Sequence, residues 1–157
     1  MRKSIIAILM TFCLSIMTYA QTPRDRATEL KEQAQSSLNQ KDYIKARYLF
    51  KKAYEAFASR ENYPQAIECG VQANALYVRE NFYKEGFELC RDMEQLLWTG
   101  EQNKKKVFYD LRFLINKERL QMYTALKNPA QAKIQLDKLE EMANLAKNDS
   151  LTEVLLY

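Results

Sequence analysis

The sequence predicts an all-α protein: an α-solenoid of about three stacked helix pairs, followed by the start of a further helix. Three segments share one spacing, in which a ring side chain is followed by a small residue three positions on, an apolar residue four further and another three further. This spacing places all four side chains on one face of a helix. The segments begin 40 and 46 residues apart, a period typical of helical-repeat proteins. The segments consist of Tyr43, Ala46, Phe50 and Ala53; Tyr83, Gly86, Cys90 and Met93; and Pro129, Ala132, Leu136 and Leu139. All of these residues except Pro129 are expected to form the repeat core.

The composition also favours helices. The chain has 157 residues, which is enough for one domain with a real core. Hydrophobic residues make up 47% and charged residues 28%, as in a soluble globular protein. Only three glycines and three prolines are present, too few for the many turns of an all-β fold. No stretch alternates between apolar and polar residues, so we expect no sheet.

The first twenty residues have the layout of a secretory signal peptide. Arg2 and Lys3 form a basic start, residues 5–17 form an apolar run of 13, and Thr18-Tyr19-Ala20 offers small residues at the first and third positions of a cleavage site. We expect cleavage after Ala20, export to the periplasm and a repeat domain over residues 21–157. The alternative is an uncleaved anchor, although 13 residues fall short of the roughly 20 that span a bilayer.

The charge gives no reason to expect nucleic acid or an anionic membrane as a partner. Removing Arg2 and Lys3 from the 24 basic side chains leaves 22, against 20 acidic ones, so the processed chain is nearly neutral. The one basic run, Lys104-Lys105-Lys106, precedes the apolar face of a long expected helix, and we interpret it as a solvated helix start. The ten tyrosines fall mostly on apolar helix faces, which favours core packing over stacking on bases.

Helix-start signals place the first three helices. Thr22-Pro23, followed by Asp25, is typical of a helix N-terminus, and apolar or small residues then recur at three- and four-residue steps. Asp42 can cap a second helix over about residues 43–59. Asn62-Tyr63-Pro64 begins a third helix, and Asn81 ends it.

The later helices have less regular boundaries. A fourth covers about residues 82–98 and is expected to end at Gly100, because glycine often follows a last helical turn. Residues 103–126 form one long amphipathic segment whose apolar face includes Val107, and Asn128-Pro129 begins a sixth helix. Ser150 opens a capping-box pattern for a seventh helix, which stops at Tyr157 without a polar cap. We therefore expect the stack to continue in a longer protein.

The repeat spacing resembles the second helix of tetratricopeptide repeats, which shows an aromatic residue, Ala, Phe and Ala at these steps. In that family a tyrosine often stands six residues before the ring; Tyr77 and Tyr123 match and join the expected core, whereas Ser37 departs from the pattern. The resemblance covers most of residues 25–147 and is closest in the first repeat. Its units are longer than the family's usual 34 residues, so the helices must be longer too.

The resemblance implies a binding groove. In tetratricopeptide repeats the first helix of each pair lines a concave surface along which a partner protein or peptide lies. The polar residues expected there are Lys31, Gln35, Asn39, Gln72, Arg79, Lys117 and Gln121. Their amide and cationic groups can hold an extended backbone or a carboxylate. The alternative, that they only keep a surface soluble, stays open, and the basic-plus-asparagine clamp of chaperone-binding members is not reproduced.

Export followed by long repeats resembles the extracytoplasmic repeat region of Bacteroidetes membrane-bound regulators. Those proteins place such repeats before a transmembrane helix and a histidine-kinase or DNA-binding output region. The resemblance implies the input region of a larger signal-transduction protein, bound to the membrane only through a downstream segment or an uncleaved signal. The alternatives are a free periplasmic adaptor for envelope assembly or nutrient uptake, and a small-ligand enzyme or receptor. The open C-terminal end also offers a surface for self-association.

The residue inventory argues against catalysis. The chain has no histidine, which removes the commonest general base and metal ligand. Cys69 and Cys90 cannot complete a four-ligand zinc site by themselves, and no glycine-rich loop is present to hold phosphates. Glu85 and Glu88 share a helix face that we interpret as solvated. We expect no enzyme activity, no cofactor and no metal. A Cys69–Cys90 disulfide stays open, because export permits it while the helical spacing favours buried thiols.

Overall fold

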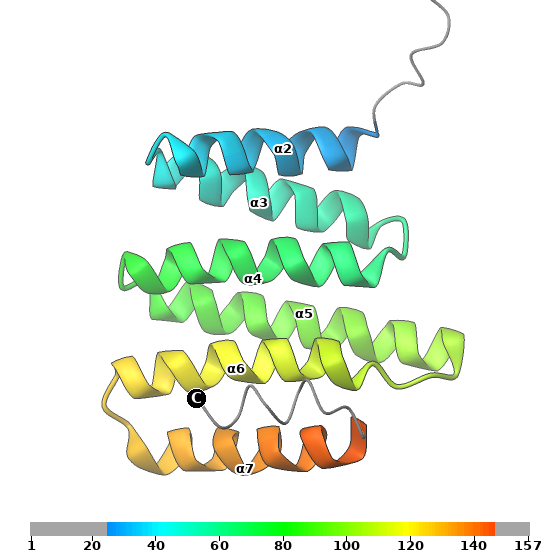
Figure 1. Cartoon of the computed structure of the whole chain (residues 1–157), viewed down its shortest axis with the longest axis vertical. Coiled ribbons are helices and arrows are strands. Elements are labelled where there is room, and N and C mark those ends of the chain that lie inside the picture. Colours follow the sequence, from blue (N-terminus) through cyan, green and yellow to red (C-terminus); the bar gives the residue numbers. More distant parts are fainter. Residues whose placement is uncertain (1–24, 147–157) are drawn as a thin grey trace, which may run out of the picture.

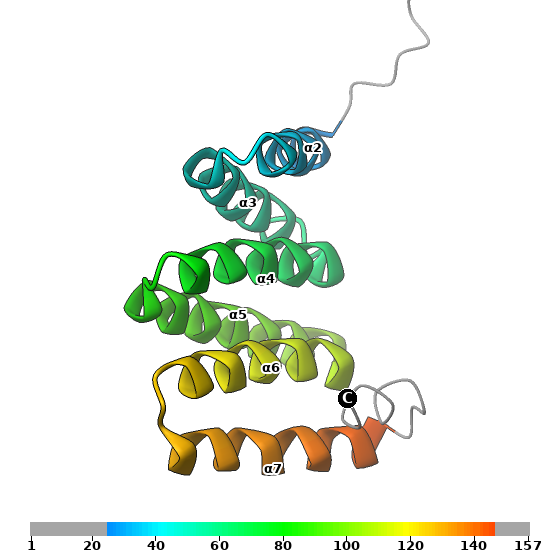
Figure 2. The same cartoon turned by 60° about the vertical axis from the view of Figure 1, so that its left-hand side comes forward.

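The computed structural model describes residues 25–146 and confirms the all-α prediction, with no strand in that range. Its helices lie one below another in an antiparallel stack (Figure 1). In the turned view of Figure 2, α2 is seen nearly end-on while α7 lies across the picture, so the helix axes rotate along the stack. The fold is therefore a helical, repeat-like array. The helices are α2 (Arg26–Asn39), α3 (Tyr43–Ala58), α4 (Tyr63–Arg79), α5 (Tyr83–Lys104), α6 (Tyr109–Ala125) and α7 (Pro129–Ala146).

Four of the connections between these helices use the same backbone turn. A non-glycine residue with positive φ is followed by a residue whose N–H donates to the carbonyl five positions earlier, over 2.9 to 3.1 Å. This combination is a Schellman-type helix end. The positive-φ residues are Lys41, Glu61, Asn81 and Lys127, and the bonds join Asp42 to Ser37, Asn62 to Phe57, Phe82 to Tyr77 and Asn128 to Tyr123. The end of α5 has the same pattern with a longer bond, since Lys105 has positive φ and the N–H of Lys106 donates to the Glu101 carbonyl at 3.3 Å.

Side-chain caps begin most of the helices, largely where the sequence indicates them. Asp42 accepts from the N–H of Lys45 at 3.2 Å, and Asn62 and Asn128 make the equivalent bonds at 3.4 and 3.2 Å. These side chains satisfy N–H groups that have no partner within the helix. Asp25 caps α2, whereas the expected cap Thr22 lies outside the described residues, as does the expected seventh helix beginning at Ser150.

Two predicted boundaries between α5 and α6 are wrong. Gly100 does not end a helix, because α5 continues through it to Lys104 and ends at Lys105, where φ is 49°. The long helix predicted over residues 103–126 begins only at Tyr109, and Val107 is exposed in the connection. The basic run at 104–106 accordingly lies at the end of one helix and not at the start of the next.

The main core lies between α2 and α6 and contains the first two repeat motifs as predicted. Ala46, Phe50 and Ala53 are buried, as are Gly86, Cys90 and Met93, while the rings of Tyr43, Tyr77, Tyr83 and Tyr123 are partly buried. Burial of such apolar faces supplies most of the free energy that holds helices together. A smaller cluster joins α6 to α7 through Phe113, Leu139 and Ala143.

The third motif is only partly buried, which corrects the prediction for Leu136. Leu139 is buried and Ala132 half-buried, but Leu136 is 40% exposed, whereas Phe50 and Cys90 at the matching positions are buried. Those two residues lie in helices that pack against the first helix of the next pair. Within residues 25–146 no helix follows α7, and its packed side carries Gln135, Leu139 and Ala143.

Candidate functional site: a polar surface on the first helices

The residues expected to line a groove lie on α2, α4 and α6, the first helices of the three pairs. Helical spacing puts those of each helix on one side, away from the buried face. Gln35, Asn39, Gln72, Arg79 and Gln121 are exposed, whereas Lys31 and Lys117 are half-buried. The surface is thus accessible along three successive first helices, although the seven side chains do not form one contact network.

Lys31 is occupied by contacts within the protein. Its Nζ donates to Oε1 of Gln65 at 2.9 Å and lies 2.7 Å from Oε2 of Glu68, so it joins α2 to α4. Glu68 compensates the lysine charge, which leaves Lys31 a poorer anion ligand than the sequence predicted. Gln65 and Glu68 were missed as functional residues, because a contact over 34 to 37 positions has no local signal in the sequence.

Two further contacts order polar groups on this surface. Gln35 Nε2 donates to Asn39 Oδ1 at 3.1 Å, one turn along α2. The guanidinium carbon of Arg79 lies 3.9 Å from the centre of the Tyr43 ring, a cation–π contact between α4 and α3. A guanidinium held over a ring keeps N–H groups available at its edge, so Arg79 is placed to bind a carboxylate.

Next to Lys117 along α6 is Glu118, which belongs to a buried polar pair. Nδ2 of Asn74 on α4 donates to Oε2 of Glu118 on α6 at 2.9 Å. Both residues are buried, and burial raises the pKa of the Glu118 carboxyl, partly opposed by the Asn74 bond and by the charge of Lys117. No sequence pattern points to this pair, because neither residue stands at a repeat-motif position.

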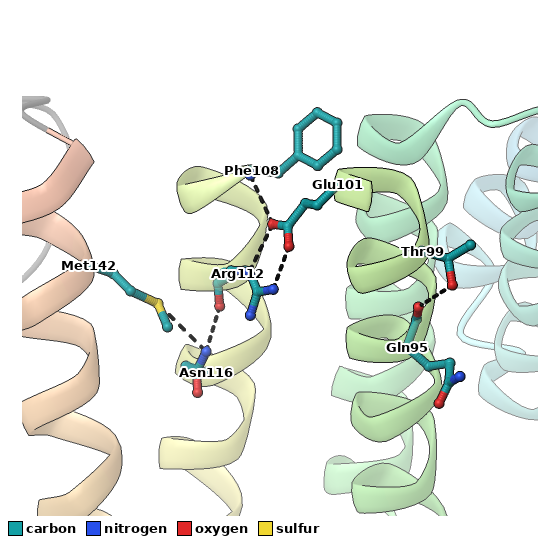
Figure 3. Close-up of polar contacts among 7 residues, drawn as sticks. All are labelled: Gln95, Thr99, Glu101, Phe108, Arg112, Asn116 and Met142. Carbon is teal, nitrogen blue, oxygen red and sulfur yellow. Dashed lines mark hydrogen bonds and ion pairs between the residues drawn. The ribbon is translucent and has the colours of Figure 1, made fainter. Parts of the chain in front are cut away.

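A second buried carboxylate fixes the connection from α5 to α6 (Figure 3). Glu101 accepts from the backbone N–H of Phe108 at 2.9 Å and from Nε of Arg112 at 2.8 Å, and Nη2 of Arg112 binds its other oxygen. The Arg112 hydrogen bond is the main reason that the pKa of Glu101 is lowered. Asn116 continues the chain of contacts to α7, donating to the Arg112 carbonyl at 2.8 Å, with Met142 Sδ 3.7 Å from the same nitrogen.

This carboxylate network stabilises the arrangement of α5, α6 and α7 and offers no exposed reactive group. Figure 3 also shows Thr99 bonding back to the Gln95 carbonyl, at 3.0 Å, within α5. Glu101 accepts from the N–H of Phe108, the N-cap residue of α6, and so ties the start of α6 to the end of α5.

Cys69 and Cys90 are free, buried thiols in the structure. Burial raises the pKa of Cys69 to about 11 and that of Cys90 to about 12, so neither is a ready nucleophile near neutral pH. Over the described stretch, no group of three or more His, Cys, Asp or Glu is placed to hold a metal ion. None of the helices within residues 25–146 combines the length and apolarity needed to cross a membrane.

Comparison of the chain with protein-family models, with curated proteins and with solved structures gave no match. The exposed groups of the site are amides and cations on consecutive first helices. Such groups form hydrogen bonds and ion pairs with another chain.

Proposed function

We propose that this protein is a protein-interaction module of the tetratricopeptide type, whose surface on α2, α4 and α6 holds an extended peptide segment of a partner. The observation that carries the proposal is the exposure of Gln35, Gln72 and Gln121 on three successive first helices of a repeat-like stack. Each amide has both donors and acceptors and can bond a peptide N–H or C=O. An extended segment crossing the three helices would meet one such group on each.

The charges on this surface favour a partner that carries carboxylates. Arg79 and Lys117 supply cations on α4 and α6, whereas Lys31 is already paired with Glu68. Charge-assisted bonds to carboxylates are stronger than bonds between neutral groups. The partner we infer is thus an extended peptide with acidic side chains or a free C-terminus.

Selection from a display library of random peptides tests this proposal. We expect enrichment of Asp and Glu, and a loss of affinity of about tenfold or more for the selected peptides when Arg79 and Lys117 are both changed to Gln. The matched control is Lys45→Gln with Lys84→Gln, which removes two exposed lysines from the second helices α3 and α5. Equal losses in both double variants would contradict a groove on the first helices.

We further propose that the module is exported and is the extracytoplasmic input region of a larger signalling protein. Support comes from the signal-peptide pattern over residues 1–20 and from the resemblance to membrane-bound regulators. A free periplasmic adaptor is the second candidate. Sequencing the gene past codon 157 separates them: a transmembrane segment with an output region supports the first, and a stop codon after one capped repeat supports the second. N-terminal sequencing of the protein from the periplasmic side should begin at Gln21.

A further inference from the structure

The buried pair of Asn74 on α4 and Glu118 on α6 leaves one polar atom without a partner. Asn74 is 0% exposed and Glu118 is 5% exposed, and the single bond between them uses Nδ2 of the amide. Oδ1 of Asn74 is buried and accepts no hydrogen bond. An unsatisfied buried acceptor is costly, so each such atom needs a physical explanation.

The backbone of α5 lies close to Oδ1 of Asn74. A Cβ placed on Gly86 would be only 3.0 Å from this oxygen and 2.7 Å from Sδ of Met122. The Asn74 amide therefore lies directly against α5, with Glu118 already bonded to its other end. An ionised carboxylate can only accept, whereas a protonated carboxyl has one hydrogen to donate. A proton on Glu118 would allow the acid and the amide to exchange two hydrogen bonds.

The charged groups near Glu118 do little to hold its carboxyl ionised. On α6 its neighbours are Lys117 and Arg119, and Arg119 is engaged by Glu94 of α5, with Nη2 2.7 Å from Oε2. Cys90 of α5 stays uncharged near neutral pH because burial raises its pKa to about 12. From α4 the facing group is the neutral Asn74, and α7 packs on a different side of α6. Among residues 25–146, Lys117 is the cation whose charge favours the Glu118 carboxylate.

We propose that a protonated Glu118 donates its hydrogen to the otherwise unpaired Asn74 Oδ1, and that loss of this hydrogen loosens the junction of α4 and α6. The loosened junction should weaken partner binding, an effect that rests on the proposed function, whereas the protonation itself does not. Below the ordinary glutamate pKa of about 4.3 the stabilising contribution is complete. It is lost as pH rises through the raised pKa of Glu118 in the folded state, because the unfolded chain has already released that proton.

The direct test is a titration of the side-chain carboxyl carbons of the wild-type protein by NMR. We expect Glu118 to titrate at higher pH than the exposed Glu85 in the same spectra. Hydrogen exchange followed over the same pH range should show α4 and α6 losing protection, after correction for intrinsic rates, as Glu118 ionises. Titration of Glu118 together with Glu85 would overturn the proposal without reference to any partner.

The variant Glu118→Gln supplies an independent test, since its amide can make both bonds of the protonated acid at every pH. Its Tm should exceed that of the wild type at pH 8, with the difference vanishing near pH 4. The control Glu85→Gln should leave the pH dependence unchanged. A Glu118→Gln protein with a lower Tm than the wild type at pH 8 would refute the shared proton. Failure of library peptides to bind at any pH would instead contradict the groove.

Discussion

The ring of Tyr63 lies directly against the backbone of Gly100, so that a Cβ at position 100 would be 2.5 Å from the ring carbon Cζ. Tyr63 is the first residue of α4 and is 3% exposed, and its ring centre is 5.5 Å from that of Phe108, just before α6. Three helices therefore meet at this ring, and the absence of a side chain at Gly100 makes the approach possible.

Gly100→Ala should destabilise the protein, although alanine is the better helix former by about 1 kcal/mol. The added methyl group must displace the Tyr63 ring, and overpacking of this kind costs about 1–3 kcal/mol. Urea unfolding of this variant and of Thr99→Ala, at an exposed neighbouring position, measures the effect. A higher midpoint for Gly100→Ala than for the wild type would show that the ring moves freely.

Glu101→Gln should destabilise the protein at neutral pH by roughly 1–3 kcal/mol, because it weakens a charge-assisted pair whose carboxylate is buried. The pKa of Glu101 is lowered in the folded state, so the stabilising contribution is present above the ordinary carboxyl pKa and is lost as pH falls through the lowered value. The difference in unfolding free energy between wild type and variant should shrink on acidification. A constant difference from pH 7 to about pH 3 would contradict the ion pair as its source.

Lys127→Gly should stabilise the protein by about 0.5–1 kcal/mol, because Lys127 has a φ of 53° and glycine adopts this left-handed conformation at no steric cost. Lys133→Gly, at an exposed position inside α7, should instead destabilise by about 1 kcal/mol. Thermal unfolding of the two variants therefore separates the conformational effect from the loss of a lysine charge. Shifts of the same sign would rule out backbone strain at the turn.

Cys69 and Cys90 should react with a thiol reagent only after unfolding, because both are buried and their pKa values are raised to about 11 and about 12. Counting reacted thiols with and without denaturant tests the expectation. An intact mass lower by two hydrogens in the absence of reductant would reveal a disulfide and contradict the free thiols of the structure.

The parts of the fold that could be predicted depend on neighbours within one helical turn. Asp42, Asn62 and Asn128 cap the helices they were expected to cap, and the spacing after Tyr43 and Tyr83 identified two buried faces. The failures depend on contacts between distant segments. Gly100 resembles a helix-ending glycine in the sequence, and only the approach of the Tyr63 ring explains its place inside α5. The exposure of Leu136 likewise depends on which side of α7 packs against α6.

The predictions for the candidate site succeeded and failed for the same reasons. Helical spacing was enough to place Gln35, Gln72 and Gln121 on exposed sides of the first helices. It could not show that Lys31 is paired with Glu68, or that α4 and α6 meet through a buried acid. These contacts depend on how far each helix is shifted along its neighbour, which side-chain packing decides.

The turn shared by four connections joins helices within a pair and between pairs alike. Its hydrogen bonds involve only the backbone, so it does not distinguish one kind of connection from the other. The order and tilt of the helices must then be encoded in the side chains that meet between them. A chain built in this way can be lengthened, shortened or recombined in steps of a single helix without a new connector. During evolution the side-chain layers could therefore diverge while the same joint was copied from one repeat to the next.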